Sequence, residues 1–316
     1  MKKRSLIIIL NPIADNGNAN KKMPLIKDFF SKKEVDFKII TTEGVGHAIS
    51  IASSFSPDPD QVIVAAGGDG TSNEVINGLM ANKILNTSAS SLQNSSNFGV
   101  LPIGRGNDFA YGAGIPADFT ESMNLLLEGD LYPIDIGFVI GGDYPQGRYF
   151  GNGVGIGFDT IVGLEAAKMK YLHGTASYIV AALKTLIMNP KAPTIEISYH
   201  GKKRTITPAL TSIMNGKRMG GSFFMAPEGD MNDGLFNLTI TEQVSRISEL
   251  KAMLLYMKGE QRKHQDTMMD SADRILLEAI SGGMTVHADG ETICIDGKTL
   301  EIKIVPSALH LISVRK

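Results

Sequence analysis

Apolar residues in the first part of the chain alternate between short continuous runs and segments with helical spacing. A continuous run such as Ser5–Leu10 is typical of a strand buried on both faces, as in a parallel sheet. Strands are expected at residues 5–10, 35–41, 61–66 and 98–101, and helices at residues 23–32, 47–55, 72–81 and 120–128. This alternation predicts an open parallel sheet with helices on both faces.

The pattern changes near Tyr132, where short alternating segments begin, separated by turn signals such as His200-Gly201. Strands are expected at residues 134–140, 148–154, 194–199, 205–214, 235–241, 274–279, 285–288, 292–295 and 300–305, with helices near 161–188 and 245–259. We therefore predict an α/β domain at residues 1–132 and a β-rich domain at residues 133–305. Residues 86–97, rich in Ser and Asn, are expected to form a mobile surface loop.

Composition narrows the class of protein. The 316 residues are 43% hydrophobic and 20% charged, which is ordinary for a globular protein, and the net charge of −2 gives no overall attraction to nucleic acid or to anionic lipid. The single cysteine, Cys294, allows no intramolecular disulfide and fits a reducing cytosol. The apolar run at residues 6–10 is too short for a signal peptide, and no uncharged run reaches the roughly 18 residues of a membrane span. We expect a cytoplasmic protein.

The strand at residues 62–66 runs into the sequence Gly67-Gly68-Asp69-Gly70-Thr71, and a helix follows. Glycines let backbone approach a phosphate or adopt positive φ, and the start of a helix attracts anions. Asp69 adds negative charge, which fits a carboxylate that polarises an acceptor hydroxyl or belongs to a cation network. The alternative, which the residues favour less, is a tight strand–helix turn that has an acidic N-cap. No Walker A sequence is present.

Three more polar loops follow predicted parallel strands. They contain Asn11-Pro12, Thr41-Thr42-Glu43 and residues 102–109, and parallel strands bring such loops to one carboxyl edge, where ligands bind in open α/β folds. Four loops are therefore expected to meet at one edge. Further on, glycine at every second position leaves one strand face open to another surface or a ligand, at Gly151, Gly153, Gly155 and Gly157.

These segments together resemble the diacylglycerol kinase catalytic family, which includes bacterial lipid kinases, sphingosine kinases and ceramide kinases. The matching segments cover nearly the whole chain in family order: Asn11-Pro12, Thr42 with Gly46-His47-Ala48, Gly67 to Glu74, Gly104 to Ala110, Asp135-Ile136-Gly137, Asn152 to Asp159, Asp230 to Leu235, and Asp289-Gly290-Glu291. The resemblance implies the fold of NAD kinases and diacylglycerol kinases: an α/β nucleotide domain and a β-sandwich-like domain that closes over a cleft. It also implies that the tail, residues 306–316, returns to the first domain.

The resemblance assigns ATP to the first domain. The residues that would line its site are Asn11, Pro12, Thr42, Gly67, Gly68, Asp69, Gly70, Thr71 and Asn73. Asp69 would face the reacting centre, and Asn107 and Asp108 would lie near the phosphates and the acceptor. Arg105 stands where the family usually has threonine. Its guanidinium could pair with a phosphate, change the acceptor or occlude the site.

In the second domain, the resemblance makes Glu291 the general base that takes the proton from the lipid hydroxyl. Asp289 would hold that base or a catalytic Mg²⁺. A structural Mg²⁺ would bind Asp233 together with the main-chain carbonyls of Asp230 and Leu235. From the residues alone, Glu291 could equally be an exposed acid in a hairpin, and Asp233 could be part of an ordinary Asn-Asp-Gly turn.

The interpretation is an ATP-dependent lipid kinase that transfers the γ-phosphoryl group to a diacylglycerol-like or sphingoid hydroxyl at the inner face of a membrane. Two alternatives remain: an NAD kinase-like enzyme, and an inactive nucleotide-binding regulator. The loop Gly104–Asp108 and the sequence Asp289-Gly290-Glu291 favour the lipid branch, and retention of Asp69, Asp108 and Glu291 argues against an inactive site. Edge strands of the β-rich domain could pair across a homodimer.

Overall fold

A computed structural model of the chain describes residues 4–85, 96–169, 175–188 and 192–314. The chain forms two compact units. Unit 1 contains residues 1–136 and 306–316, and unit 2 contains residues 137–305. The chain leaves unit 1 within strand β5 (Asp130–Gly141) and returns to it within strand β16 (Thr299–Ser313).

The sheet of unit 1 is parallel. Its strand order is β2-β1-β3-β4-β16, and each neighbouring pair in this row is parallel. The bounds are β1 (Ser5–Leu10), β2 (Phe37–Thr41), β3 (Gln61–Gly67) and β4 (Asn97–Pro102). Strands β1, β3 and β4 are buried almost throughout, as continuous apolar runs predict for a parallel sheet covered on both faces.

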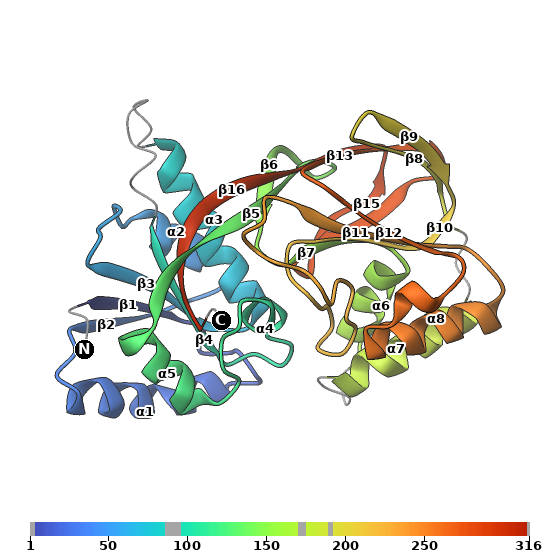
Figure 1. Cartoon of the computed structure of the whole chain (residues 1–316). Helices are drawn as coiled ribbons and strands as arrows, with labels where there is room; N and C mark the ends of the chain where they lie inside the picture. The colour runs from blue at the N-terminus through green and yellow to red at the C-terminus, as the bar shows by residue number, and fades with distance from the viewer. Residues whose placement is uncertain (1–3, 86–95, 170–174, 189–191, 315–316) are drawn as a thin grey trace. The chain divides into compact units, whose positions relative to one another are not determined.

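Helices cover both faces of this sheet. Helices α1 (Asn18–Lys32) and α5 (Phe119–Glu128) lie on one face, and α2 (His47–Ser53) and α3 (Asp69–Leu85) lie together on the other (Figure 1). A short helix, α4 (Asp108–Gly112), follows β4. The sequence prediction of an α/β unit with an open parallel sheet is therefore confirmed.

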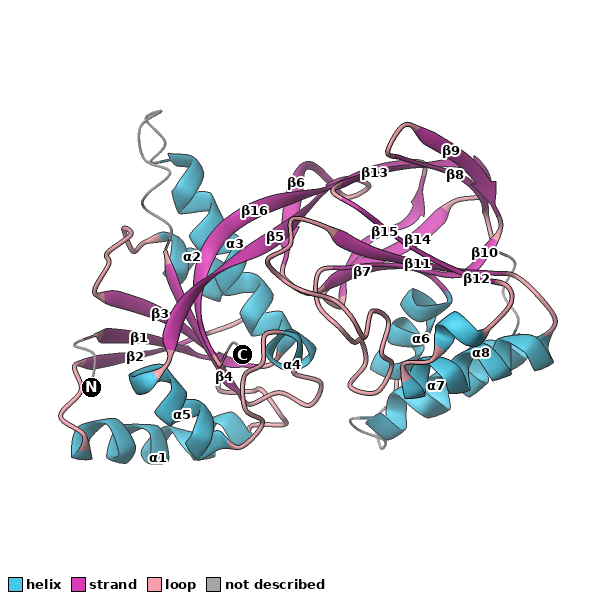
Figure 2. Cartoon of the chain, in the orientation of Figure 1, coloured by secondary structure: helices cyan, strands magenta, loops and turns pink. Residues whose placement is uncertain are grey.

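Unit 2 contains an antiparallel six-stranded sheet with the order β12-β11-β10-β7-β14-β15. Figure 2 shows these strands in magenta. Their bounds are β7 (Gly153–Gly157), β10 (Pro208–Met214), β11 (Phe236–Glu242), β12 (Thr267–Ala272), β14 (Met284–Ala288) and β15 (Glu291–Gly297).

A second layer of strands packs on one face of this sheet. It consists of β8 (Thr194–Tyr199), β9 (Lys202–Ile206), β13 (Arg274–Ser281), the first half of β16, and β6 (Tyr144–Phe150) paired with β5. The core between the layers joins Ile156 and Ile213 of the first sheet to Ile197, Ile275 and Ile302 of the second. The prediction of a sandwich-like β unit is confirmed.

Three helices cover the other face of the six-stranded sheet. They are α6 (Phe158–Ala167), α7 (Thr175–Met188) and α8 (Arg246–Lys258), and a 3₁₀ turn, η1 (Gln261–Lys263), follows α8 (Figure 2). The core beneath them is rich in methionine, with Met214, Met219 and Met225 buried. Gly153 of β7 faces this layer, because a Cβ added there would lie 2.5 Å from the sulfur of Met214. At Gly153 the space left by the missing side chain is therefore filled by methionine side chains.

Several predicted boundaries were wrong. The strand expected at residues 148–154 is two strands, β6 and β7, and the strand expected at 205–214 is divided between β9 and β10. Strand β12 and helix α4 were not predicted. Of the predicted mobile loop, residues 86–95 lie outside the described residues. Asn97 already belongs to β4, where its amide donates to the carbonyl of Pro59 at 2.9 Å.

Candidate functional site

The four predicted loops meet at the carboxyl edge of the sheet of unit 1. They follow β2, β1, β3 and β4, which are neighbours in that order. Thr42 N donates to the carbonyl of Leu10 at 2.9 Å, and Asn11 N donates to the carbonyl of Ala66 at 3.0 Å. The structure therefore brings the predicted ATP-site loops together within one unit, as parallel pairing requires.

The loops after β3 and β4 touch backbone to backbone. Ile103 N donates to the carbonyl of Gly67 at 2.8 Å. A Cβ added to Gly104 would lie 2.3 Å from the Cα of Gly68, and a Cβ added to Gly68 would lie 3.1 Å from the Cα of Gly104. Neither residue has a positive φ. Glycine is required here for close approach of the two loops, not for the left-handed conformation that the sequence also allowed.

Asp69 connects these two loops through its carboxylate. Its Oδ1 accepts a hydrogen bond from Phe109 N at 3.0 Å, in the first turn of α4. Asn107, at φ 51°, closes the loop by accepting from Gly104 N at 2.9 Å and donating to Gly104 O at 2.8 Å. The adjacent Asp108 is buried. The first half of the candidate site is thus a pair of interlocked loops at the start of α3.

Asn11 and Thr71 join the first loop to this pair. Asn11 Nδ2 donates to Thr71 Oγ1 at 3.2 Å, and Asn11 Oδ1 accepts from Ile13 N at 3.2 Å, which folds the chain around Pro12. Asn73, predicted to line the ATP site, is completely buried, and its carbonyl accepts from Asn77 Nδ2 at 2.9 Å. The structure places Asn73 in the interior of the unit.

Glu74 is a residue of this motif to which the sequence assigned no role. Its carboxylate accepts from Gly46 N at 2.8 Å and from Ala48 N at 3.0 Å, at the start of α2. A carboxylate at a helix start satisfies backbone N–H groups that have no partner within the helix. Glu74 therefore attaches α2 and the loop after β2 to α3. The position of Glu74 at the end of the run Gly67–Glu74 was the only sequence signal for a role at this site. Its hydrogen-bond partners could not be predicted, because they are 26 and 28 residues away in the chain.

Arg105, which replaces the usual threonine of the family, contacts the loop after β1. Its Nη2 donates to Asn16 Oδ1, and its Nε lies 3.7 Å from Asp15 Oδ1. Both side chains of the Arg105–Asp15 pair are about one-third exposed, at 35% and 36%. Arg105 thus joins the loop after β4 to the loop after β1.

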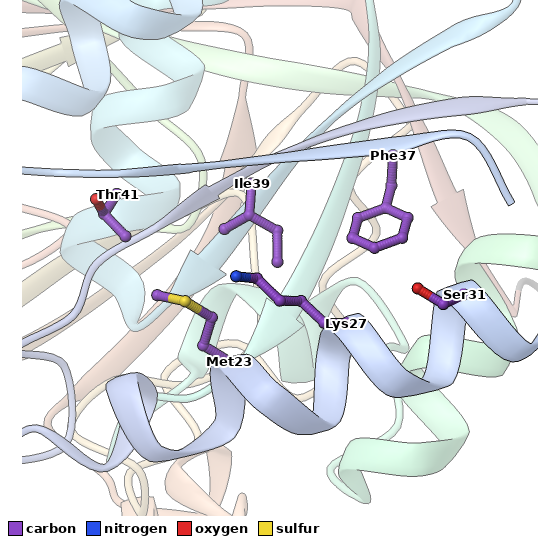
Figure 3. Close-up of a pocket in the computed structure, with 6 residues that line it drawn as sticks. All are labelled: Met23, Lys27, Ser31, Phe37, Ile39 and Thr41. Carbon is purple, nitrogen blue, oxygen red and sulfur yellow. The ribbon is translucent and has the colours of Figure 1, made fainter.

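A groove of about 330 Å³ lies between α1 and β2. Figure 3 shows the Lys27 side chain extended between Met23 and Ile39 in this groove, and Thr41 at one end of it. Thr41 is the last residue of β2. Apart from this end, the groove lies outside the four loops, and no predicted ATP-site residue lines it.

In unit 2, Asp289 organises the turn that precedes Glu291. Its carboxylate accepts three backbone hydrogen bonds, from Gly151 N at 2.7 Å and from Asn152 N and Gly153 N at 2.9 Å each. These bonds interrupt the strand that the sequence predicted at 148–154. Glu291 begins β15 two residues later, and its side chain is partly exposed. The carboxylate of Asp289 therefore fixes this turn against residues 151–153, and its role in holding Glu291 or a Mg²⁺ stays a prediction.

Asn152 is a second residue whose role the sequence did not reveal. Its carbonyl accepts from Gly216 N at 2.7 Å, and its Nδ2 donates to Arg218 O at 2.9 Å. Among the described residues its buried Oδ1 has no hydrogen-bond partner. Gly216 in turn packs closely against Gly229, whose added Cβ would lie 2.6 Å from the Gly216 carbonyl oxygen. Asn152 therefore links the Asp289 turn to the segment that precedes the predicted metal loop.

The predicted metal ligands Asp230, Asp233 and Leu235 form an exposed turn before β11. Asp230 Oδ1 accepts from Asn232 N at 3.1 Å, and Asp233 Oδ1 accepts from Leu235 N at 2.9 Å. No group of three acidic, histidine or cysteine side chains gathers anywhere in the described part of the chain. One carboxylate with main-chain carbonyls and water still gives the oxygen-only ligand set that Mg²⁺ prefers. The turn therefore fits the predicted ion in its chemistry.

Two family models match the chain. The diacylglycerol kinase catalytic domain matches residues 5–139, and the YegS C-terminal NAD kinase beta sandwich-like domain matches residues 152–313. Among the helices that the structure describes, none is long and apolar enough to cross a membrane.

Proteins of similar sequence and structure are also named diacylglycerol kinases. A diacylglycerol kinase from Bacillus subtilis is 29% identical over 288 residues, which cover 90% of this chain and 88% of that protein. One from Staphylococcus aureus is 30% identical over 295 residues, covering 92% and 87%. The crystal structure of a putative diacylglycerol kinase from Bacillus anthracis shares the fold, with a TM-score of 0.76 at 22% identity over 98% of this chain and 97% of that one. The chain therefore belongs to the diacylglycerol kinase family.

Proposed function

We propose that this protein is an ATP-dependent lipid kinase that transfers the γ-phosphoryl group of ATP to the hydroxyl of a diacylglycerol-like or sphingoid lipid at a membrane surface. The observation that supports this most directly is the interlocking of the loop at Gly67–Thr71 with the loop at Gly104–Asp108 at the start of α3. A helix start beside glycine-rich backbone is a favourable place for phosphate groups.

Phosphoryl transfer depends on position and on neutralisation of charge more than on covalent chemistry. In this proposal the four loops of unit 1 hold the triphosphate, and Mg²⁺ supplies positive charge when it is bound. Unit 2 binds the acceptor lipid and contributes Glu291. The carboxylate of Glu291 takes the proton from the attacking hydroxyl. Asp289 is a positioning residue, because its carboxylate holds the turn that carries Glu291.

The acceptor is identified by incubating the protein with labelled ATP, Mg²⁺ and a total lipid extract, and by determining the mass of each labelled product. NAD is supplied in a parallel reaction. Label in a lipid monophosphate is the expected result. Label in NAD alone would identify an NAD kinase-like enzyme, and tight ATP binding without transfer to either acceptor would identify a nucleotide-binding regulator.

Glu291→Gln tests the base. General-base help is worth about 100-fold to 10,000-fold in rate, so kcat is expected to fall by that factor. The affinity for ATP, measured by calorimetry, is expected to stay within about twofold, because Glu291 belongs to unit 2 and contacts none of the ATP loops in this proposal.

Glu242→Gln is the matched control, since Glu242 is an exposed acid at the end of another strand of the same sheet, β11. Glu242→Gln should leave both kcat and the affinity for ATP unchanged. Near-normal turnover of Glu291→Gln would show that another group takes the proton.

A further inference from the structure

Arg105 is the only lysine or arginine in the four loops at the carboxyl edge of unit 1. These loops are residues 11–17, 42–46, 67–71 and 103–107. The same loops contain three carboxylates, those of Asp15, Glu43 and Asp69. A triphosphate is strongly negative, and enzymes that bind one usually oppose it with a lysine or an arginine besides the metal ion. The proposed nucleotide site therefore has one side chain in its loops that can do this.

The side chain of Arg105 reaches across the end of β3. Strand β3 lies between β1 and β4 and pairs with both. Arg105 follows β4, yet its guanidinium contacts Asp15 and Asn16, which follow β1. Neighbouring strands lie about 4.8 Å apart, so a contact between these two loops spans roughly 10 Å across the end of β3. It therefore crosses the loop Gly67–Thr71, which the proposed function assigns to phosphate.

A tight turn presents Asp15 and Asn16 to Arg105. Asp15 has φ 49° and Asn16 has φ 55°, in the left-handed region that aspartate and asparagine enter more readily than most residues. Asp15 Oδ2 accepts from Asn18 Nδ2 at 2.9 Å, at the start of α1, and Asp15 Oδ1 lies 3.7 Å from Arg105 Nε. One oxygen of this carboxylate is therefore held by α1, and the other faces the guanidinium.

The backbone beside Arg105 is fixed, but the contact of its side chain is weak. Gly104 forms two hydrogen bonds with the Asn107 side chain and packs against Gly68. The Arg105–Asp15 pair is about one-third exposed on each side, and exposed ion pairs contribute little net free energy. A terminal phosphate carries more negative charge than one carboxylate and also accepts two parallel hydrogen bonds from a guanidinium. A phosphate can therefore displace Asp15 at little cost.

We propose that Arg105 binds a phosphate of the nucleotide, and that Asp15 and Asn16 hold its guanidinium until the phosphate replaces them. Asp15 is then a positioning residue, because it acts on the nucleotide only through Arg105. This role of Arg105 rests on the proposed function, since the group that displaces Asp15 belongs to ATP. Of the three roles that an arginine at this position allows, these contacts favour the pairing with phosphate.

A double-mutant cycle between Asp15 and Arg105 tests this. The variants are Asp15→Asn, Arg105→Thr, which restores the usual residue of the family, and the two combined. Asparagine has the shape of aspartate, tolerates the same φ and can still accept from Asn18, so the turn is kept, and thermal melting verifies this. Calorimetry measures the affinity of each full-length protein for the β,γ-imido analogue of ATP in the presence of Mg²⁺.

Arg105→Thr is expected to lower the affinity for the analogue by about tenfold to one-hundredfold, as the loss of hydrogen bonds to a charged group does. Asp15→Asn is expected to raise it by about twofold to fivefold, because the guanidinium no longer has to leave a carboxylate. Combined with Arg105→Thr, Asp15→Asn should have no effect, since coupled residues are not additive. An equal gain in both backgrounds would show that Asp15 repels the phosphates directly, and would overturn the proposal.

Two further variants serve as controls. Asp28 is an exposed acid of α1 that pairs with Lys32 at 2.8 Å, so Asp28→Asn removes the same charge outside the four loops and should leave the affinity unchanged. Arg105→Lys keeps the positive charge but loses the two parallel hydrogen bonds. Its affinity should therefore lie between that of the unaltered chain and that of Arg105→Thr.

The Nε–H resonance of Arg105 reports the exchange of partners directly. In protein labelled with ¹⁵N-arginine, it is the cross-peak that disappears in Arg105→Lys. Asp15→Asn should shift this resonance in the free protein, and the ATP analogue should move it to a similar position with and without the Asp15 carboxylate. A resonance that the analogue does not shift would overturn the proposal.

Kinase assays separate this role of Arg105 from the proposed function. Phosphorylation of a lipid by the unaltered chain, with no coupling between Asp15 and Arg105, would refute the role of Arg105 and leave the lipid kinase intact. Coupling without phosphorylation of any lipid would support the role of Arg105 and refute the kinase. A chain that did not bind the analogue at all would refute both.

Discussion

At the scale of single residues, the tightest constraint at the candidate site is the contact between Gly68 and Gly104. A Cβ on Gly104 would lie 2.3 Å from the Cα of Gly68 and 2.6 Å from Asn107 Oδ1. Because one of these contacts is backbone, Gly104→Ala must separate the loops. We expect a loss of about 1–3 kcal/mol of stability, which is typical of overpacking, and at least a tenfold loss of ATP affinity. Urea unfolding and calorimetry measure the two effects.

Gly163→Ala is the control for this substitution. Gly163 lies inside α6, has no positive φ, and its added Cβ would meet no atom within 4 Å. Alanine favours the helix by about 0.5–1 kcal/mol, so the control should be slightly more stable and bind ATP normally. If Gly104→Ala behaved like Gly163→Ala, close approach of the two loops would not be needed for binding.

Residue types predicted that the four loops meet at one edge better than they predicted the contacts between the loops. Glycine beside a helix start indicated phosphate binding, and the structure places the four loops at one edge. The carboxylates were harder to interpret, since Asp69, Glu74 and Asp289 all accept hydrogen bonds from backbone N–H groups of other segments. Asp289 and Gly151 are 138 residues apart, and no local pattern reports such a partner.

At the scale of elements, buried parallel strands were predicted well and strand breaks were not. The continuous apolar runs of β1 and β3 gave their bounds to within one residue. The break between β6 and β7 has no local signal, because it is made by the carboxylate of Asp289. Strand β12, with the sequence TMMDSA, lacks regular alternation and is half exposed, so periodicity could not reveal it.

Glu165 connects α6 to α7 and predicts a dependence of stability on pH. Hydrogen bonds from Lys168 at 2.7 Å and Lys184 at 2.5 Å lower the pKa of Glu165 from its ordinary 4.5 to about 2. A lowered pKa in the folded state adds stability above the unfolded value of 4.5, and this contribution is lost as the pH falls toward 2. Glu165→Gln should therefore lower the melting temperature at neutral pH.

The difference in melting temperature between the unaltered chain and Glu165→Gln should shrink steadily below about pH 4.5. Lys203 pairs with Glu196 at 2.6 Å on an exposed strand surface, which makes Glu196→Gln the control for a general loss of one carboxylate. Surface pairs contribute little, so its melting temperature should differ less from that of the unaltered chain. A difference for Glu165→Gln that did not change with pH would mean that packing, not charge, explains it.

At the scale of the whole molecule, the hydrophobic pattern alone predicted two domains and their fold classes. It did not predict that the chain returns from the second unit to the first at its C-terminal end. Alternation of strands and helices predicted the first domain, and short alternating segments predicted the second. The final segment, residues 306–313, continues a strand that begins in unit 2, and nothing in its own hydrophobic pattern assigns it to unit 1. Only the family resemblance predicted that, because pairing between residues more than 200 apart leaves no periodic signal.

The returning tail should decide whether unit 1 is stable. Leu311 is completely buried and pairs with Phe98 of β4, so Leu311→Ala leaves a cavity in unit 1 and should cost about 2–5 kcal/mol. Hydrogen exchange read by mass spectrometry should show faster exchange in β3 and β4, with β10 and β11 of unit 2 unchanged. Val314→Ala, at a side chain that is 53% exposed, should alter neither, because surface substitutions usually stay within about 0.5 kcal/mol. Faster exchange in both units of Leu311→Ala would show that they unfold as one, whereas exchange confined to unit 1 would show that the last strand stabilises the predicted ATP-site loops independently of the β-rich unit.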